Sequence, residues 1–241
     1  MSSANTSRLA RGNHLLSGLS DGAHAILAPL LQIVDLAASQ TLHERGQPFS
    51  CVYFPITAIL SATLPLQVGM PMQVASVGNE GFSGVEMLAR AASPFHTYRC
   101  QIAGRAACMS VADFTQALDT VPELHRSTHA CLQVFMNQLM QTECCNSVHT
   151  FEGRFARWLL MARERTGDDT FFLPRETLVD MLSVRRQNVS LMVRSFQQAG
   201  LIHYQLGRMQ VLNWQGLQEA SCECYCRPAT HTDVVVSAAL A

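Results

Sequence analysis

Hydrogen-bonding side chains are concentrated in one short stretch of the 241-residue chain, which contains Arg185, Arg186, Gln187, Asn188 and Ser190. Guanidinium and amide groups can bond to base edges in the major groove of DNA, and arginine and serine can also bond to phosphates. Side chains of these types on the outer face of one helix would therefore suit contact with DNA.

Apolar residues at helical spacing lie on both sides of a break at Ser183-Val184. They are Leu178, Met181 and Leu182 before the break and Val189, Met192, Val193 and Phe196 after it. Two short amphipathic helices joined by a tight turn form a helix-turn-helix, and its second helix enters the major groove. The alternative is an ordinary helical hairpin whose arginines only face solvent.

A predicted β-hairpin follows this second helix. Ala199-Gly200 is typical of a helix end, and two strand-like runs then flank Leu206-Gly207. A hairpin directly after a recognition helix is a wing, which can reach the flanking minor groove. Three arginines around these elements are expected to hold the DNA backbone, namely Arg175, Arg194 and Arg208.

Charge is distributed unevenly along the chain, whose net charge is only -1. Residues 1–153 carry 7 arginines against 10 acidic residues, whereas residues 154–208 carry 9 arginines against 5. Phosphate attraction depends on a local basic face rather than on total charge. The distribution therefore favours a nucleic-acid contact in the segment that holds the helix-turn-helix.

In the part of the chain before this segment, the apolar residues follow a different spacing. Short apolar or alternating runs at 50–55, 59–66 and 72–77 predict an antiparallel β-roll between Thr41 and Met109. A long helix is expected over 123–147, apolar on more than one side. One side can pack on the roll and the other on a partner helix, which suits two-fold symmetric DNA sites. The alternative is a helix wholly buried in one subunit.

The predicted fold class is α+β with five segments. Residues 1–22 are a flexible leader, 23–120 the β-roll domain, 121–148 the dimerisation helix, 149–227 the winged helix-turn-helix domain and 228–241 a tail. The roll domain is expected to begin with a helix over 23–38, capped by Asp21. Thr150 is expected to cap the helix that follows the hinge.

This order of elements and several local motifs resemble the Crp/Fnr family of bacterial transcription regulators over roughly residues 25–226. The motifs are Val52-Tyr-Phe-Pro-Ile56, Gly78-Asn-Glu-Gly-Phe-Ser-Gly84, Arg154-Phe-Ala-Arg-Trp-Leu-Leu160, Met181-Leu-Ser-Val-Arg-Arg186, Ala199-Gly-Leu-Ile202 and Cys222-Glu-Cys-Tyr225. Together they are more specific than a helix-turn-helix pattern alone.

The resemblance implies a cyclic-nucleotide-binding-like roll, a dimerisation helix and a DNA-binding winged helix that regulates transcription as a homodimer on a palindrome. An activator of this type would also contact RNA polymerase. Arg186 and Gln187 fall where the family has an Arg-Glu pair that contacts bases and phosphates. Leu191 replaces a common arginine and Ser183 a common glycine, so the half-site should differ from the usual one.

The effector pocket that the family uses for cyclic nucleotides is only partly matched. Such a pocket needs a glutamate for the ribose and an arginine with a neighbouring serine or threonine for the phosphate. Glu80 stands at the expected place, but Arg99 is followed by Cys100. We therefore expect an effector other than a cyclic nucleotide and no cofactor. The alternative role for Glu80 is that of a turn residue.

Nine cysteines are present, and Cys222-x-Cys224-x-Cys226 is the densest group. With Cys144, Cys145 and His231 it could hold zinc or act as a redox switch, although a spacing of two alternates between the faces of a strand. No cysteine precedes Cys51, which argues against an iron–sulfur sensor, and haem ligation by His96, His125, His129 or His149 has no supporting pattern. A metal or redox sensor remains an alternative, as does a sensor module without DNA binding.

The sequence argues against an enzyme and against a membrane protein. The roll region has no His-x-His pair of a cupin-like metal enzyme, and the chain has no phosphate loop or Gly-x-Ser-x-Gly turn. The longest uncharged run, 46–79, contains four prolines and is unsuited to a spanning helix. A cytoplasmic protein is expected.

Overall fold

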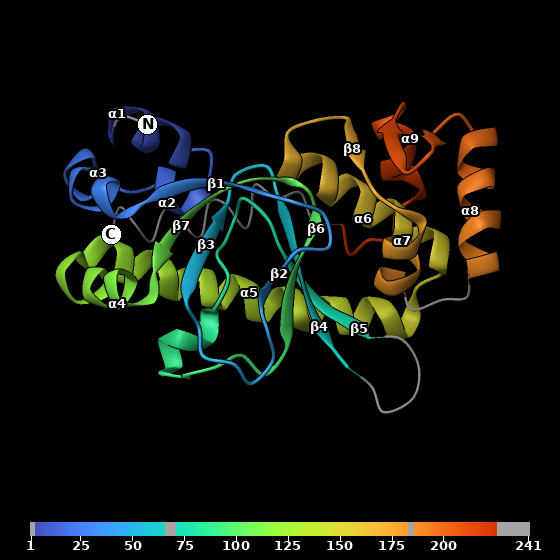
Figure 1. Ribbon diagram of the computed structural model, residues 1–241. Helices are drawn as coiled ribbons and strands as arrows, with labels where there is room; N and C mark the ends of the chain where they lie inside the picture. Colours follow the sequence, from blue (N-terminus) through green and yellow to red (C-terminus); the bar gives the residue numbers. More distant parts are fainter. Residues whose placement is uncertain (1–2, 66–70, 183–185, 226–241) are drawn as a thin grey trace.

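The computed structural model describes residues 3–65, 71–182 and 186–225, with a β-roll, a long helix and a C-terminal helical domain (Figure 1). The α+β class and the order of these parts agree with the sequence-based prediction. Among the described helices, none has the length and apolar character needed to cross a bilayer.

The first residues are more ordered than predicted. Instead of a flexible leader, the chain forms α1 (Ser3–Ala10) and α2 (His14–Ser17), with Leu15 and Leu16 fully buried. Asn13 caps α2 and donates to the carbonyl oxygens of Pro55 and Gly81, each at 2.8 Å. Because these bonds and apolar contacts attach the segment to the roll, the prediction of a loose leader was wrong.

The predicted helix over 23–38 was also wrong. The chain forms α3 (Asp21–Leu27), whose cap is Ser20 rather than Asp21, then a 3₁₀ turn, η1 (Ala28–Leu30), and then strand β1 (Gln32–Leu36). Pro29 lies in the 3₁₀ turn and cannot donate the backbone hydrogen bond that a continuing helix would need.

The roll consists of two antiparallel sheets, as predicted. One sheet has the order β1-β7-β3 and the other β2-β6-β4-β5. The further strands are β2 (Thr41–His43), β3 (Cys51–Pro55), β4 (Ile59–Leu64), β5 (Met72–Val77), β6 (Thr97–Ile102) and β7 (Gly104–Ser110), with the 3₁₀ turn η2 (Val85–Ala89) between β5 and β6.

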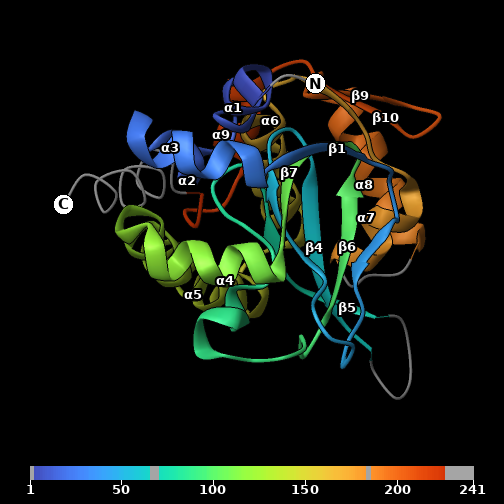
Figure 2. The same ribbon diagram turned by 60° about the vertical axis from the view of Figure 1, so that its left-hand side comes forward.

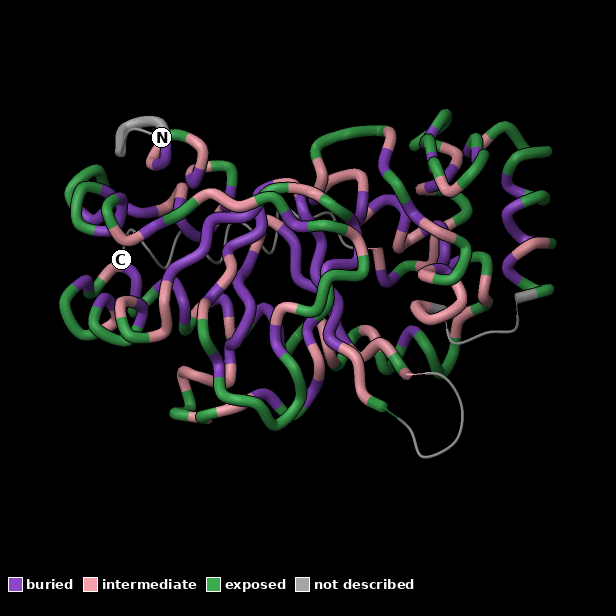
Figure 3. The backbone as a smooth tube through the Cα atoms, viewed as in Figure 1, coloured by how far each residue is buried: buried purple, intermediate pink, exposed green. Residues whose placement is uncertain are grey.

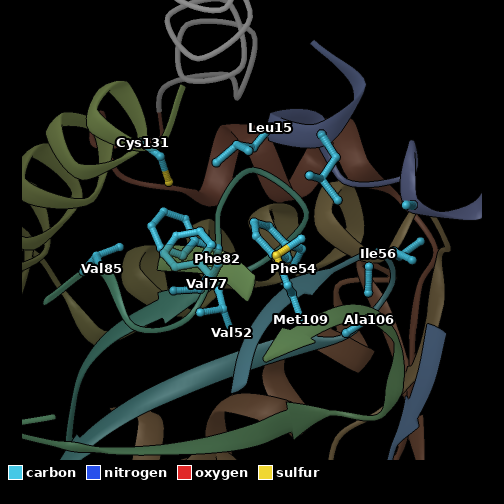
Figure 4. Close-up of a cluster of buried hydrophobic side chains, with 14 of the residues drawn as sticks. Leu15, Val52, Phe54, Ile56, Val77, Phe82, Val85, Ala106, Met109 and Cys131 are labelled. Atoms are coloured by element: carbon cyan, nitrogen blue, oxygen red, sulfur yellow. The ribbon is translucent and has the colours of Figure 1, made fainter. Parts of the chain in front are cut away.

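Aromatic rings fill the end of the roll that faces the helices (Figure 4). Phe54 of β3 lies 5.8 Å from Phe82 between ring centroids, and Phe82 lies 5.6 Å from Phe114 of helix α4 (Val111–Thr120). All three rings are fully buried. Aromatic rings of this size bury large apolar areas, so this cluster anchors α4 to the roll.

Helix α5 (Pro122–Val148) runs along the roll and confirms the predicted long helix. Leu124, Cys131 and Phe135 are buried on one side. Met136 and Met140 are 47% and 57% exposed on the other side. The helix therefore has apolar side chains outside the face that packs on the roll. Figure 3 shows this alternation of buried and exposed positions along the elements.

The C-terminal domain contains seven further elements around its own core. They are α6 (Phe151–Thr166), β8 (Thr170–Phe172), α7 (Arg175–Leu182), α8 (Arg186–Gln198), β9 (Ile202–Gln205), β10 (Arg208–Val211) and α9 (Trp214–Ala220). Thr150 caps α6 through the amide of Gly153, as predicted.

This domain packs against the outer face of the four-stranded sheet of the roll. Ile59 of β4 and Ile102 of β6 are almost completely buried, and they belong to the C-terminal core rather than to the core of the roll. Figure 1 shows α6 and α7 nearer to this sheet and α8 farther away from it.

Candidate nucleic-acid interface

Helices α7 and α8 form the helix-turn-helix that the sequence predicted. Leu178 of α7 is fully buried, and so is Val189 of α8, with Met192, Val193 and Phe196 at most 5% exposed. Phe196 packs on Phe155 of α6, with 5.2 Å between ring centroids. The inner face of α8 is therefore fixed by apolar contacts, which determines the face that it presents to solvent.

The outer face of α8 carries most of the predicted base-reading residues. Gln187 and Asn188 are exposed, and Ser190 is half-buried. Arg194, which was predicted to hold the DNA backbone, is also exposed on this helix. Arg186 begins the helix, although its side chain lies outside the described residues, as does Arg185 entirely. An exposed amide pair near the start of α8 suits the geometry of groove-reading helices, whose first residues contact base edges.

Leu191 adds an apolar contact surface to the same outer face. Its side chain is 68% exposed, one turn from Gln187 along the helix. An apolar side chain in a major groove can contact a thymine methyl group but cannot bond to phosphate.

The wing is a three-stranded antiparallel sheet in the order β8-β10-β9. Its tip is Leu206-Gly207, both with positive φ, at 50° and 80°. A Cβ atom on Gly207 would come within 2.7 Å of the Phe172 ring, so both conformation and space require glycine there. Arg208 follows the tip and is exposed, and the sharp turn directs it away from the domain core.

Arg175 lies at the start of α7, where it is exposed and its guanidinium carbon is 5.9 Å from the centre of the Tyr204 ring. The Tyr204 hydroxyl donates to the carbonyl oxygen of Leu173 at 3.0 Å. Because Tyr204 joins the wing to the segment before α7, the contact holds Arg175 between the two predicted DNA-binding elements.

Several arginines of the basic segment have structural partners instead. Arg163 pairs with Asp169, and Arg157 donates to the carbonyl oxygen of Cys224 at 3.2 Å. The arginines predicted to contact DNA are Arg175, Arg194 and Arg208, together with Arg185 and Arg186, whose side chains lie outside the described residues. The positive charge available to DNA is thus smaller than the arginine count suggested.

Glu80, the first predicted effector residue, forms a buried ion pair with Arg165 of α6. The Arg165 Nη2 and Nε atoms lie 2.7 Å and 3.1 Å from the two carboxylate oxygens. Nη1 donates to the Ser76 hydroxyl at 2.7 Å, and Gly78 N donates to Glu80 Oε1 at 3.1 Å. A Cβ atom on Gly78 would lie 2.5 Å from the Arg165 side chain, so this close approach requires glycine.

Arg99, the second predicted effector residue, lies on the opposite face of its strand from the roll interior. It is exposed on β6, whereas its neighbour Tyr98 is fully buried in the roll. Burial raises the pKa of Asp180 on α7, and the nearby charge of Arg99 opposes this shift. Glu80 and Arg99 therefore each face a charged residue of the C-terminal domain.

The cavity beside Glu80 is too small for a nucleotide in this conformation. Its volume is about 10 Å³, with Phe82, Cys131 and Phe135 among its lining residues. A volume near this size holds about one water molecule.

Sequence reasoning missed Arg165, although a signal for it was present. Arg165 follows Ala162 by three positions, and Ala162 and Leu159 lie on the buried face of α6. Helical spacing therefore placed this arginine on the inner face, where it needs an acidic partner.

The conformation after α9 decides how the predicted cysteine group is arranged. Cys222 and Cys224 are in a turn, not a strand, so a spacing of two brings their side chains to the same place, next to Cys145. Cys144 is exposed and outside this group, while Cys226 and His231 lie outside the described residues. The expectation that the two cysteines point to opposite faces was wrong because it assumed a strand.

Comparison with known proteins identifies the C-terminal part at the level of a domain. Residues 153–220 match the model of a Crp-like helix-turn-helix domain. A search of curated proteins gave no match.

Solved structures with the same fold extend over most of the chain. A CRP-family regulator from Thermus thermophilus has a TM-score of 0.63 at 19% identity, covering 78% of this chain and 96% of its own. FixK2 from Bradyrhizobium japonicum has a TM-score of 0.63 at 15% identity, covering 80% of this chain and 98% of its own. A protein from Eubacterium rectale assigned to the Crp/Fnr family has a TM-score of 0.62 at 13% identity, covering 86% of this chain and 96% of its own.

Proposed function

We propose that this chain, a Crp/Fnr-type regulator in fold with a Crp-like helix-turn-helix domain, binds DNA sequence-specifically and regulates transcription. The observation that carries the proposal is the outer face of α8, where Gln187, Asn188 and Arg194 are exposed while the opposite face is fixed in the core. Arg186 would join them at the start of the helix. Such a regulator would act in the cytoplasm, where bacterial DNA lies.

The backbone contacts in this proposal come from Arg175, Arg194 and Arg208. All three are exposed, and none has an ion-pair partner among the described residues. Phosphate contacts of this kind fix the register of a protein on DNA without reading its sequence.

The active form in this proposal is a homodimer joined along α5. Met136 and Met140 give α5 an exposed apolar strip, and half-buried Leu132 and Leu139 border it. One recognition helix contacts only a few base pairs, so a second copy related by two-fold symmetry is needed for a specific site.

The effector in this proposal is not a cyclic nucleotide. Glu80 already has a complete set of partners in Arg165, Ser76 and the amide of Gly78. Removing it to bind a ribose would leave Arg165, which is 7% exposed, as an uncompensated buried charge.

Selection of binding sites from random duplex DNA tests the function. We expect enrichment of a palindrome whose half-sites are about one helical turn, roughly 34 Å, apart. Failure to enrich any sequence above the starting pool would contradict the proposal and would favour a sensor module that acts through protein contacts.

A further inference from the structure

Four potential metal ligands come together where α5 meets the segment after α9. Cys145 and His149 belong to the end of α5, and Cys222 and Cys224 come from the turn after α9. In Figure 2 the red segment after α9 runs back toward α5. The three sulfur atoms and one imidazole nitrogen all lie within 4.8 Å of one another.

Two of the separations between these atoms match those across a tetrahedral zinc site. Cys145 Sγ lies 3.5 Å from Cys222 Sγ, and Cys224 Sγ lies 3.6 Å from His149 Nδ1. Zinc bonds of roughly 2.3 Å to sulfur and 2.0 Å to nitrogen imply ligand separations of about 3.5 to 3.8 Å across a tetrahedron. We propose that Cys145, His149, Cys222 and Cys224 bind one Zn²⁺ ion.

The histidine is oriented for this role by a carboxylate. His149 Nε2 lies 2.9 Å from Glu223 Oε1. A carboxylate oxygen can only accept a hydrogen bond, so Nε2 is the protonated nitrogen and donates the hydrogen bond. The lone pair of Nδ1 then faces Cys224. Metal-binding histidines commonly have this outer partner, which fixes the tautomer and the direction of the ring.

Further groups around the cluster suit thiolate ligands. Gln141 Nε2 donates to Cys224 Sγ at 2.8 Å, and the guanidinium of Arg157 is bonded to the Cys224 carbonyl oxygen. Three thiolates and a neutral imidazole around Zn²⁺ leave one net negative charge, which the nearby arginine offsets. Cys145 is 1% exposed and Cys224 is 8% exposed, so water is largely excluded from the site.

A dithiol switch explains the cluster less completely. A disulfide between Cys145 and Cys222 would use two of the four groups and give no role to the orientation of His149 by Glu223. An iron–sulfur cluster would hold its ligands around several atoms, whereas these four ligand atoms all lie within 4.8 Å of one another. Three thiolates and one imidazole in a tetrahedral set are typical of a structural zinc site.

The location gives the ion a mechanical role. The ligands come from both sides of the break at His149-Thr150, at which α5 ends and α6 begins. Cys222 also approaches Gly153 in the first turn of α6, where a Cβ atom would lie 3.4 Å from the Cys222 amide nitrogen. Bound zinc would fix the angle between α5 and the C-terminal domain, and with it the position of α8.

Metal analysis of the full-length protein, purified without oxygen or chelator, tests the site. We expect about one zinc per chain in the unchanged protein and in Cys144→Ser, a matched control because Cys144 is the exposed neighbour on the same helix. Cys222→Ser and Cys224→Ser should lose the metal. Replacement by Co²⁺ should give the strong visible bands of a tetrahedral, thiolate-bound ion in the first two proteins alone.

A milder variant covers the case in which the cysteine variants do not fold. Glu223→Gln changes a side chain that is 83% exposed and should weaken zinc binding by about 10- to 100-fold in competition with a chelator. Zinc-free unchanged protein that neither binds added zinc nor gives the cobalt spectrum would overturn the proposal. Equal metal content in Cys222→Ser, or a Cys145–Cys222 disulfide in the oxygen-free preparation, would do so as well.

Discussion

The arginines of the C-terminal domain divide into those that could read bases and those that could hold phosphates. Arg186 begins α8, whose outer face carries the exposed Gln187 and Asn188, whereas Arg208 follows the tip of the wing. Base contacts determine sequence preference, and phosphate contacts add affinity that salt weakens.

Replacement of each arginine by alanine should separate these roles. Arg186→Ala should cost roughly 1–3 kcal/mol on the specific site and relax selectivity at one position, because a base contact is lost. Arg208→Ala should weaken specific and random duplexes alike and reduce the salt slope by about 1. A gel-shift salt titration measures both effects, and equal losses on both duplexes for Arg186→Ala would contradict its assignment.

His43 makes the roll sensitive to acid. It is 4% exposed, lies 2.9 Å from the Ser83 hydroxyl and packs on the rings of Phe49, Tyr53 and Tyr98. Burial, and then the nearby charge of His96, lowers the pKa of His43 from 6.5 to about 4. The unfolded chain therefore binds this proton at a higher pH than the folded chain does.

The contribution of neutral His43 to the free energy of unfolding is fully present above pH 6.5. It is lost as the pH falls toward 4. At pH 5 the loss due to His43 should be roughly 2 kcal/mol. His43→Gln should remove this part of the pH dependence, measured by urea unfolding at pH 7 and pH 5. His125→Gln is the control because His125 is exposed. An unchanged pH dependence in His43→Gln would show that the buried neutral imidazole is not its source.

At the scale of elements, α5 has an apolar strip that the described part of its own chain leaves exposed. Met136→Glu combined with Met140→Glu should convert a dimer to a monomer, because charged side chains would be placed in the interface. Sedimentation velocity measures the change. Ile26→Glu on α3 is a matched control, since Ile26 is 53% exposed elsewhere on the surface. A double variant that remains a dimer would place the interface away from this strip.

Sequence periodicity was sufficient for the elements with long or repeated patterns. Strands β3, β4 and β5, helix α5 and the apolar face of α8 were predicted within a few residues, because burial on one face imposes its period on the sequence. The N-terminal helices were missed because their order depends on Asn13, which bonds to the distant residues Pro55 and Gly81.

The candidate sites show the same limit. The outer face of α8 follows from local spacing, but the pairing of Glu80 with Arg165 and of Cys145 with Cys222 joins residues far apart in sequence. A single sequence does not show how close in space two such residues lie. The four-ligand cluster in particular depends on a turn after α9 that periodicity cannot predict.

At the scale of the whole molecule, the Arg165–Glu80 pair connects the C-terminal domain to the roll. The Arg165 and Glu80 side chains are only 8% and 14% exposed, so loss of one partner leaves the other charge largely shielded from water and uncompensated. Glu80→Gln should lower the free energy of unfolding by about 3 kcal/mol. Urea unfolding measures this, with exposed Glu44→Gln as the control. Equal stability of the two variants would rule out a structural role for the pair.

The central claim concerns two copies of α8 that read equivalent bases in two half-sites. Parallel site selections with the unchanged protein and Asn188→Ala test it most directly. We predict that the unchanged protein selects a palindrome and that Asn188→Ala loses preference at the same position in both half-sites, because the exposed amide on each α8 meets an equivalent base. Identical selected sequences for the two proteins, or a change confined to one half-site, would contradict the claim.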